Sequence, residues 1–476
     1  MIKITYAKVP PTKASKTGSS DQMRAGVGKN VTIIQFHKDK EIKFVEKGKS
    51  SELYIKAPKN VDRRKLIVLI RKAIRVAKEQ KLKKIAFNFS ALKALIPKKI
   101  TDEEFASIFG QNIEMANFEF TEFRTRPKEG WPSITEITII GSVSAKTKTL
   151  LKRGQTIGIY VNHCRRISNT PGGDMTPKIM VSEAKKLAKD AKIKMTILGR
   201  KELKKLKAGA ILGVAQGSRE EPQFIVMEYK GGSVKEKPIV LVGKGVTFDT
   251  GGINIKTGDS ALGMHMDMSG GAAVICAIAL ASKLKIKKNI VALVPAVENM
   301  PGGAAYRPGD VLRSMSGKTI EIRNTDAEGR VILADALTYA RKYKPRLVVD
   351  VATLTGSALA ALGERANAIM TKSKKLQDLF IHLGEESGDY MWPLPLWEEY
   401  EEEVKGIRGD VTNTNNKNSR YGGAINGGIF LHEFAKGMPW VHIDMAPRME
   451  SIPSDNLAPG AAGEPVRFLL KLVEVF

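Results

Sequence analysis

Two segments of the chain set charged side chains beside glycines, at points where apolar runs end. They are VGKGVTFDTGGINIKTGDSALGMHMDMSGG (242–271) and EIRNTDAEGR (321–330), and their charged candidates are Lys244, Asp249, Lys256, Asp267, Asp326 and Glu328. Asp326 and Glu328 lie two residues apart, so an extended backbone would point both carboxylates the same way. Converging carboxylates repel one another unless cations neutralise them, and the carboxyl ends of covered strands are where α/β sheets bind ligands. The combination predicts a divalent-metal site.

Each of these residues has a plainer interpretation when it is taken alone. An Asp before Gly-Gly is commonly a turn residue, an Asp-x-Glu pair is commonly solvated surface, and Lys244 could simply flank a strand. Other catalytic patterns are absent from the sequence, which has no GxxxxGK[ST] phosphate loop, no GxGxxG, no GxSxG and no HExxH. The six histidines do not pair at ligand spacing, and we interpret His265 and His442 as packed or surface residues.

The second segment and its neighbours resemble a known family. NTDAEGR (324–330), followed by VILADAL, is similar to the signature of the leucine aminopeptidase (cytosol aminopeptidase) family of two-metal exopeptidases. Further matching blocks follow the family's order: SNTPGGDMTP (168–177), VGKGVTFDTGG (242–252), RPGDVLRSMSGKTIEI (307–322), DVATLTG (350–356) and WVHIDMA (440–446). The resemblance extends from about residue 165 to residue 476. It implies an enzyme that releases N-terminal amino acids from peptides with a free N-terminus.

The resemblance implies two divalent ions per subunit, Mn²⁺ and/or Zn²⁺, held by five ligands. The ligands would be Lys244, Asp249, Asp267, Asp326 and Glu328, with Asp249 and Glu328 bridging the two ions. Two ions about 3.5–4 Å apart can share a water and lower its pKa. Lysine ligates a metal only as the neutral amine, so Lys244 is expected to be buried beside cations that depress its pKa.

The resemblance also implies two catalytic residues and a substrate pocket. Lys256 would donate to the carbonyl oxygen as its negative charge develops, and Arg330 would hold a bicarbonate that accepts the proton of the attacking water. The α-amine of the substrate would coordinate metal and approach Asp267. The residues around the first side chain would be Met264, Asn324, Thr353, Gly356, Ala446 and Met449. Two methionines make such a pocket apolar and adaptable, which favours N-terminal Leu, Met and other apolar residues.

Four positions depart from the family pattern. Ala261 lies where the family often has Met, Pro447 and Arg448 lie where Gly and a small residue are common, and Glu464 replaces a basic residue in GAAGEPV (460–466). The departures affect the substrate pocket and the packing of the C-terminal segment. The ligand set itself is complete, which favours an active enzyme over an inactive paralogue.

Hydrophobic patterning indicates the elements that must position these residues. In the first 150 residues we expect strands at 31–36, 84–89 and 134–141, and an amphipathic helix at 62–80 with its Lys and Arg on the polar face. Strands at 238–243, 289–297 and 346–353 are continuous apolar runs, typical of a sheet covered on both faces. Helices are expected after Thr176, at 270–284 and, with Arg330 just before it, at 331–343, whereas the Asn- and Gly-rich stretch 413–428 predicts a loop.

The sequence therefore predicts an α/β fold of two domains. A smaller, basic α/β domain would occupy 1–145, a connecting helix and linker 146–175, and a larger catalytic domain with a helix-covered mixed β-sheet 176–476. The family resemblance adds a homohexamer with its active sites facing an inner cavity.

Charge is the unusual part of the composition. The 476 residues include 77 Lys and Arg against 50 Asp and Glu, a net charge of +27, and residues 1–150 alone carry +16 of it. Such an excess is typical of a solvated face. It also supports an alternative function, in which the basic N-terminal domain binds DNA or RNA on an aminopeptidase scaffold. A two-metal hydrolase of phosphoesters is a further alternative.

The compartment can be predicted from cysteine usage and from the apolar segments. Cys164 and Cys276 cannot build a disulfide framework, which fits a reducing compartment. The start of the chain, MIKITYAKVPPTK, lacks the apolar core of a signal peptide, and the apolar stretch 270–281 is shorter than the roughly 18 residues of a membrane-spanning helix. We therefore expect a cytoplasmic protein without a membrane segment.

Overall fold

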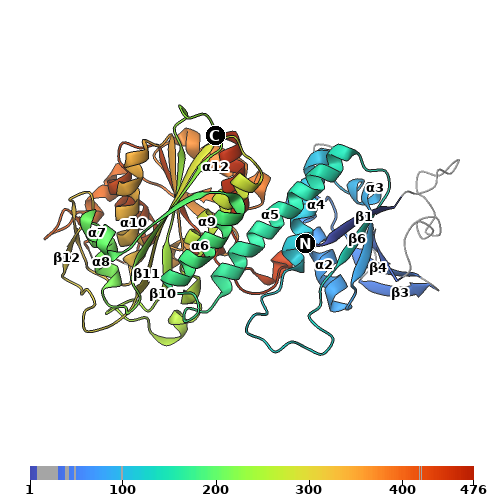
Figure 1. The fold of residues 1–476 in the computed structure, drawn as a ribbon, viewed down its shortest axis with the longest axis horizontal. Helices are drawn as coiled ribbons and strands as arrows, with labels where there is room; N and C mark the ends of the chain where they lie inside the picture. Colours follow the sequence, from blue (N-terminus) through green and yellow to red (C-terminus); the bar gives the residue numbers. More distant parts are fainter. Residues whose placement is uncertain (8–29, 38–41, 48–49, 98–99, 418, 420) are drawn as a thin grey trace. The chain divides into compact units, whose positions relative to one another are not determined.

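The computed structural model describes residues 1–7, 30–37, 42–47, 50–97, 100–417, 419 and 421–476. They form two compact units (Figure 1): unit 1 is Met1–Asn162 with Ser451–Pro459, and unit 2 is His163–Glu450 with Gly460–Phe476. Both units are α/β, as predicted. The division falls inside α5 (Ala145–Asn169), a continuous helix, so the limits proposed for the domains from the sequence stay a prediction.

Unit 1 contains one sheet and the helices that cover it. Its elements are β1 (Lys3–Ala7), β2 (Thr32–His37), β3 (Lys43–Lys47), β4 (Ser50–Lys56), α2 (Arg63–Glu79), β5 (Lys84–Asn88), α3 (Phe89–Lys93), α4 (Asp102–Asn117), β6 (Glu136–Ile140) and the 3-10 helix η6 (Pro453–Asp455). The strands lie in the order β1-β6-β5-β2-β4-β3, and each pair is parallel except β3–β4. The predicted strands are thereby confirmed.

Helix α2 follows the predicted amphipathic pattern with two exceptions. It begins at Arg63 because the Asp62 side chain accepts a hydrogen bond from the Lys65 amide at 2.8 Å. Arg71 and Lys78 are buried instead of lying on the polar face. Each has polar partners, since Arg71 Nε donates to Asn112 and Lys78 Nζ pairs with Glu119. Periodicity alone could not show this, because the partners belong to other segments of unit 1.

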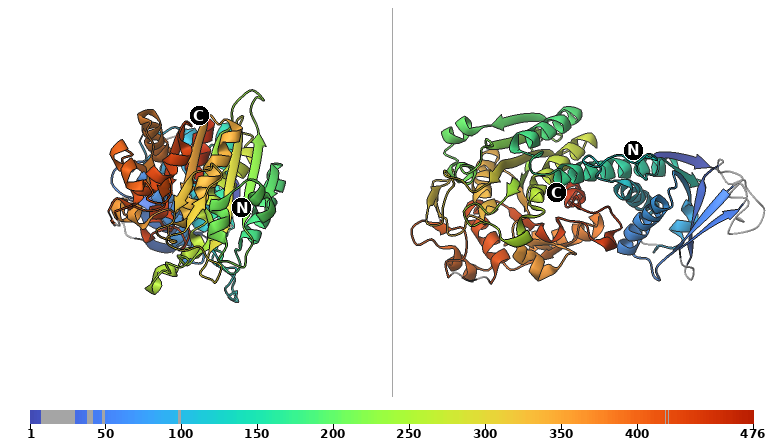
Figure 2. Two further views of the ribbon diagram at one scale, coloured as in Figure 1. Left: turned by 90° about the vertical axis from the view of Figure 1, so that its left-hand side faces the viewer. Right: turned by 90° about the horizontal axis from the view of Figure 1, so that it is seen from below.

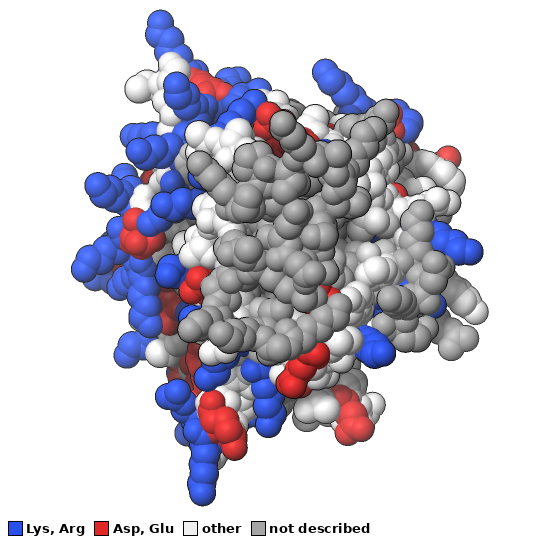
Figure 3. Space-filling view, turned by 90° about the vertical axis from the view of Figure 1, so that its right-hand side faces the viewer, with Lys and Arg blue, Asp and Glu red and all other residues white. Residues whose placement is uncertain are grey.

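Most of the positive charge lies on the surface. Lys3 and Lys146 have side chains 71% and 73% exposed. Figure 3 shows Lys and Arg side chains crowded along one side of the face in view, with Asp and Glu scattered among them. The basic excess is therefore mostly solvated, as the sequence suggested.

Unit 2 contains the larger sheet and the helices around it. They are α6 (Pro177–Ala191), β7 (Lys194–Leu198), α7 (Arg200–Lys205), α8 (Gly209–Ala215), β8 (Gln223–Lys230), β9 (Ile239–Gly243), β10 (Gly245–Asp249), η1 (Gly258–Ala261), η2 (Met264–Met266), α9 (Ser269–Lys283), β11 (Asn289–Asn299), β12 (Val311–Arg313), β13 (Thr319–Glu321), α10 (Glu328–Ala340), η3 (Arg341–Tyr343), β14 (Leu347–Ala352), α11 (Gly356–Leu362), β15 (Asn367–Met370), α12 (Lys374–Ser387), β16 (Met391–Pro393), η4 (Glu398–Val404), β17 (Val411–Thr412), α13 (Gly423–Ala435), β18 (Trp440–Asp444), η5 (Ala446–Arg448) and α14 (Val466–Val475).

The large sheet is mixed and has helices on both faces (Figure 2). Its order is β16-β15-β18-β14-β9-β11-β8-β7, with β10 pairing to β11, and its central strands β18, β14, β9 and β11 run parallel. Val240 and Val242 of β9 belong to the core cluster that includes α8, α10 and α13. Gly243 faces the other way, against α9, where an added Cβ would lie 2.6 Å from the Gly270 carbonyl oxygen. Continuous apolar strands are the expected consequence of this double cover.

Two boundaries in unit 2 differ from the prediction. Helix α10 begins at Glu328 instead of residue 331, and α13 begins at Gly423, inside the predicted loop 413–428. Gly427 explains the second difference. A Cβ there would lie 3.0 Å from Leu354 Cδ2 and 3.3 Å from Arg330 Nη2, so the glycine allows the helix to pack closely in the interior.

One helical segment of the described residues, Gly258–Lys283, is long and apolar enough to cross a membrane by length and composition. It exceeds the apolar stretch 270–281 because two 3-10 turns lead into α9. Its most apolar window is 89% buried inside the fold, as expected for a central core helix.

Candidate metal centre

The candidate residues meet where parallel strands of the large sheet end. Lys244 follows β9, Asp249 is the last residue of β10, and Thr353 follows β14. Asp267 lies two residues before the start of α9, and the NTDAEGR segment leads from β13 into α10. Because these carboxyl ends share one edge of the sheet, segments far apart in the sequence bring their side chains together.

The backbone that carries Asp326 and Glu328 is not extended, which corrects the prediction. Residues 325 and 326 form a turn, and Glu328 is the first residue of α10. Gly329 is the second residue of the helix. It lies in the helix against Lys244, where an added Cβ would come within 2.7 Å of Nζ. The helix therefore brings Glu328 and the lysine together only because residue 329 has no side chain.

Lys244 pairs with two of the candidate carboxylates. Its Nζ lies 2.8 Å from Asp267 Oδ1 and Oδ2 and 2.9 Å from Glu328 Oε1, and it donates to the Thr353 carbonyl oxygen at 2.9 Å. All three charged side chains are almost completely buried. Burial alone lowers the pKa of Lys244, but the carboxylates of Asp267, Glu328 and Asp249 more than offset this and raise it. The depressed pKa predicted for Lys244 therefore requires bound cations.

Lys256 pairs with the other two carboxylates. Its Nζ lies 2.8 Å from Asp249 Oδ2 and also contacts Asp326 Oδ1. Asp249 is buried, and its Oδ1 accepts hydrogen bonds from Asn299 Nδ2 and the Gly251 amide. Asp326 is the most accessible member, with 35% of its side chain exposed. Lys256 thus lies between a buried carboxylate and the solvent-accessible one.

The donor set fits divalent cations. Oxygen atoms of Asp249, Asp326 and Glu328 all lie within 4.8 Å of one another, close enough to share an ion. Both oxygens of Glu328 and Oδ2 of Asp267 are buried and, among the described residues, accept no well-formed hydrogen bond. An unsatisfied buried carboxylate is costly, and a cation bound in front of it would relieve that cost. Burial, and next to it the negative charge of Asp249, raises the pKa of Glu328 to about 8. The raised pKa has the same cause, a shortage of positive charge around these carboxylates.

Arg330 is also buried close to this cluster. It is the third residue of α10, and its Nη1 donates to the Asn413 carbonyl oxygen at 2.9 Å. Burial lowers the pKa of Arg330 to about 10, with Asp444 and then Glu328 opposing that shift. Its Nε has no hydrogen-bond partner among the described residues, so a donor remains available to a planar oxyanion.

The residues predicted around the first side chain fall into two groups. Thr353 and Asn324 contact the candidate ligands directly, since Thr353 Oγ1 donates to Asp267 Oδ1 at 2.8 Å and Asn324 Oδ1 accepts from the Asp326 amide at 2.8 Å. Gly356, Ala446 and Met449 are half-buried or exposed and form no hydrogen bond to those ligands in the described contacts. Met264 is half-buried, and its carbonyl oxygen accepts a hydrogen bond from the Asp267 amide at 3.3 Å.

Asp444, which sequence reasoning missed, connects the loops that carry part of this pocket. It ends β18 and is fully buried. Its carboxylate accepts hydrogen bonds from the amides of Leu354 and Ala446 and from the Thr355 hydroxyl. Asp444 therefore fixes the 353–356 loop against the turn at 446.

Asn413 is a second residue that sequence reasoning missed. It lies just after β17, is fully buried, and accepts at Oδ1 from the Arg323 amide while its Nδ2 donates to the Asn324 carbonyl oxygen at 2.6 Å. Its own carbonyl oxygen accepts from Arg330. One side chain thus fixes the loop that carries Asp326, and its backbone holds Arg330. The Asn-rich composition suggested only a loop, and a contact pattern such as this has no local signal.

We expect Asn413→Ala to lower kcat/KM for leucine amide by about 10–100-fold, the usual effect of losing a residue that orients metal ligands. The apparent affinity for Mn²⁺ should fall with it, because the loop that carries Asp326 loses its restraint. Asn416→Ala is the matched control: it lies in the same loop but bonds the backbone of Glu402 and Lys405. Equal activity of the two variants would refute the role of Asn413.

The geometry and the relatives identify the chain together. A helix-covered mixed sheet that gathers four carboxylates and two lysines at its strand ends is the arrangement of a metallohydrolase. The family model described as the cytosol aminopeptidase family, catalytic domain, matches residues 162–470. The chain belongs to this family, and it is an aminopeptidase, a metal-dependent hydrolase that acts on peptides.

Individual relatives agree with this assignment. A probable cytosol aminopeptidase of Syntrophotalea carbinolica is 40% identical over 406 residues, covering 84% of this chain and 80% of that protein. One from Azoarcus sp. is 44% identical over 331 residues, covering 70% and 65%. Among solved structures, the bottromycin maturation enzyme BotP in complex with Mn is 26% identical with a TM-score of 0.83, covering 94% of this chain and 99% of that chain.

Proposed function

We propose that this aminopeptidase works with two divalent ions, Mn²⁺ and/or Zn²⁺, held by Lys244, Asp249, Asp267, Asp326 and Glu328. The observation that carries the proposal is the buried carboxylate of Glu328. Among the described residues its oxygens accept no well-formed hydrogen bond, and the carboxylates of Asp249 and Asp326 lie beside it, so a cation could bind all three. The relative BotP was solved with Mn, which supports Mn²⁺ as one occupant. When bound, the ions would lower the pKa of a water and polarise the scissile carbonyl.

The surrounding residues would then each have a defined task. Lys256 keeps its charge because Asp249 and Asp326 more than offset the effect of burial and raise its pKa. It can therefore donate to an oxygen that becomes negative during the reaction. Arg330 would hold a bicarbonate through its Nε, which has no hydrogen-bond partner in the described part of the chain, and would accept no proton itself. Asp267, oriented by Thr353, would receive the α-amine of the substrate and so restrict cleavage to the first residue.

We propose that the first side chain lies among Met264, Asn324, Thr353, Gly356, Ala446 and Met449. The adaptable methionines favour Leu, Met and other apolar N-terminal residues. A homohexamer in the cytoplasm is the expected assembly and compartment, and native mass spectrometry of the purified chain measures the assembly. DNA or RNA binding by the basic N-terminal region stays an alternative prediction. It would collapse between low and moderate salt, whereas hydrolysis would not.

The decisive experiment is removal and return of the metal. Chelator treatment followed by dialysis should abolish leucine amide hydrolysis, and Mn²⁺ or Zn²⁺ should restore it, because the ions would supply the activated water and the polarisation of the carbonyl. Native mass spectrometry of the restored protein should show two ions per subunit. Full activity in the metal-free protein would refute the proposal, and restoration with one ion per subunit would refute its two-metal form.

A further inference from the structure

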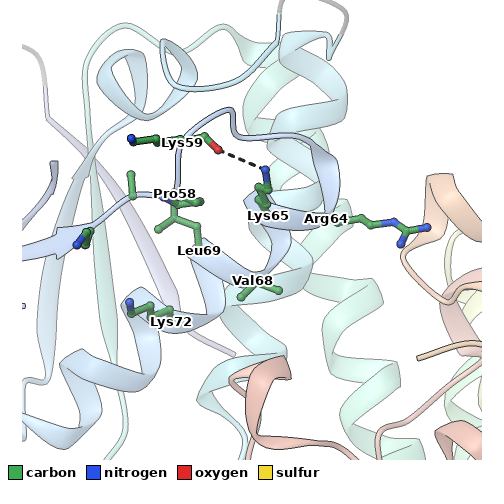
Figure 4. A pocket seen from close by; sticks show the side chains of 9 residues that line it. Pro58, Lys59, Arg64, Lys65, Val68, Leu69 and Lys72 are labelled. Atoms are coloured by element: carbon green, nitrogen blue, oxygen red, sulfur yellow. Dashed lines mark hydrogen bonds between the residues drawn. The ribbon is translucent and has the colours of Figure 1, made fainter. Parts of the chain in front are cut away.

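Unit 1 contains a cavity that has no part in the proposed reaction. It has a volume of about 510 Å³ and lies between the end of β4 and the first turns of α2 (Figure 4). The described residues that line it are Lys56, Ala57, Pro58, Lys59, Arg64, Lys65, Val68, Leu69 and Lys72. We call it the α2 pocket. Its volume falls in the range of roughly 300–1,000 Å³ that is typical of ligand-binding pockets.

The centre of the α2 pocket is apolar. Pro58, Val68 and Leu69 lie together in the middle of Figure 4, and Val68 is 36% exposed although it is an aliphatic residue of a helix with a large buried face. Apolar surface that remains in contact with water in a concave site favours an apolar side chain of a partner. The pocket therefore offers a place for a single aliphatic anchor.

The edge of the α2 pocket is cationic. Five of its lining residues are Lys or Arg, and none is acidic. Lys59 and Lys72 lie at its margin in Figure 4, whereas Arg64 is turned away and Lys65 is held by hydrogen bonds to the carbonyl oxygens of Lys59 and Asn60. The partner must therefore be anionic.

We propose that the α2 pocket binds an acidic peptide segment, with one aliphatic side chain in the pocket and flanking carboxylates on Lys59 and Lys72. Charge complementarity with Lys59 and Lys72 at the margin of the pocket, whose described lining includes no acidic residue, selects an acidic partner. Nucleic acid fits the pocket less well, because the described lining residues include no aromatic ring and single-stranded bases bind chiefly by stacking on such rings. The site would recruit acidic polypeptides to the enzyme through contacts separate from the metal centre.

The test is fluorescence anisotropy on the full chain with a short labelled peptide of alternating Glu and Leu. The peptide is N-acetylated, so that it offers no free amine to the aminopeptidase site. Lys59→Glu with Lys72→Glu should weaken binding by roughly tenfold or more, since like charges are then set opposite the peptide. Val68→Asp should weaken binding to a similar extent, because it places a negative charge at the apolar centre of the pocket. Leucine amide hydrolysis should be unchanged in these variants, which also shows that they fold.

Matched controls separate this site from general attraction between opposite charges. Lys83→Glu with Lys84→Glu makes the same change of charge at two exposed lysines beyond the C-terminal end of α2 and should leave binding intact. A peptide with Ser in place of Leu should bind much more weakly. The proposal would be overturned if the Ser peptide bound equally well or if the control variant weakened binding equally. It would also be overturned if a single-stranded oligonucleotide bound more tightly at the same lysines.

Discussion

Glu328→Ala is expected to lower kcat/KM for leucine amide by roughly 10³-fold or more, the scale of losing an essential member of a catalytic unit. Glu328 is 1% exposed, faces Lys244 and accepts no well-formed hydrogen bond among the described residues. Its removal would take away the carboxylate proposed to bridge the two ions. Asp326→Ala should have a comparable effect through the same site. Steady-state kinetics together with metal content by native mass spectrometry provide the measurement.

The fold should survive this substitution. Lys244 would keep its contacts with Asp267 and the Thr353 carbonyl oxygen, and a poorly satisfied buried carboxylate would be gone. Glu298→Ala is the matched control: Glu298 is a half-buried acid near the end of β11, bonded to the Ser218 hydroxyl and outside the proposed ligand set. The assignment would be contradicted if Glu328→Ala retained a tenth of the wild-type kcat/KM and Glu298→Ala lowered kcat/KM to the same extent.

The second large effect is expected on stability, at two residues that depart from the family pattern. Arg448 Nε and Nη2 both donate to Glu464 Oε1, at 2.9 and 2.8 Å, and Asn367 Nδ2 donates to the other Glu464 oxygen at 3.0 Å. Arg448 Nη1 donates to the Glu364 carbonyl oxygen, and both charged residues are buried. Glu464→Ala would remove the carboxylate that accepts two hydrogen bonds from the buried guanidinium, and breaking a buried ion pair costs about 3–5 kcal/mol of unfolding free energy.

Denaturant unfolding measures this cost. Arg448→Ala should be comparably destabilising, and the double variant should be less so than the sum of the two, because the charges are removed together. Glu402→Ala is the control, since Glu402 and Lys405 form a pair whose side chains are 69% and 63% exposed. An exposed pair contributes at most about 1 kcal/mol. Strict additivity of the two buried substitutions would show that they do not act as a pair.

Arg448 and Glu464 illustrate what cannot be predicted from the sequence alone. Arg448 replaces a small residue and Glu464 replaces a basic one, and the two positions are 16 residues apart. Taken one at a time, each departure predicts only a change in packing. The structure explains both at once, because Arg448 in η5 and Glu464 before α14 satisfy each other in the interior. A single sequence contains no signal for such compensation.

The sequence by itself determined the chemical set and the local elements. Runs such as IVLVG predicted buried strands, and Thr176 predicted the start of a helix that its side chain caps. The six charged candidates were identified from residue type and spacing. These features are local, because propensity, capping and alternation act over a few residues.

The tertiary structure alone decided how those residues are used. It joined Lys244 to Asp267 and Glu328, began α10 at Glu328, and placed Asn413 and Asp444 as the supports of the site loops. The physical reason is that a buried polar group must find its partner in space, and the sheet order sets which distant segments meet. Residue type and spacing could therefore predict the candidates for a metal centre, whereas only the packed sheet could show what positions them.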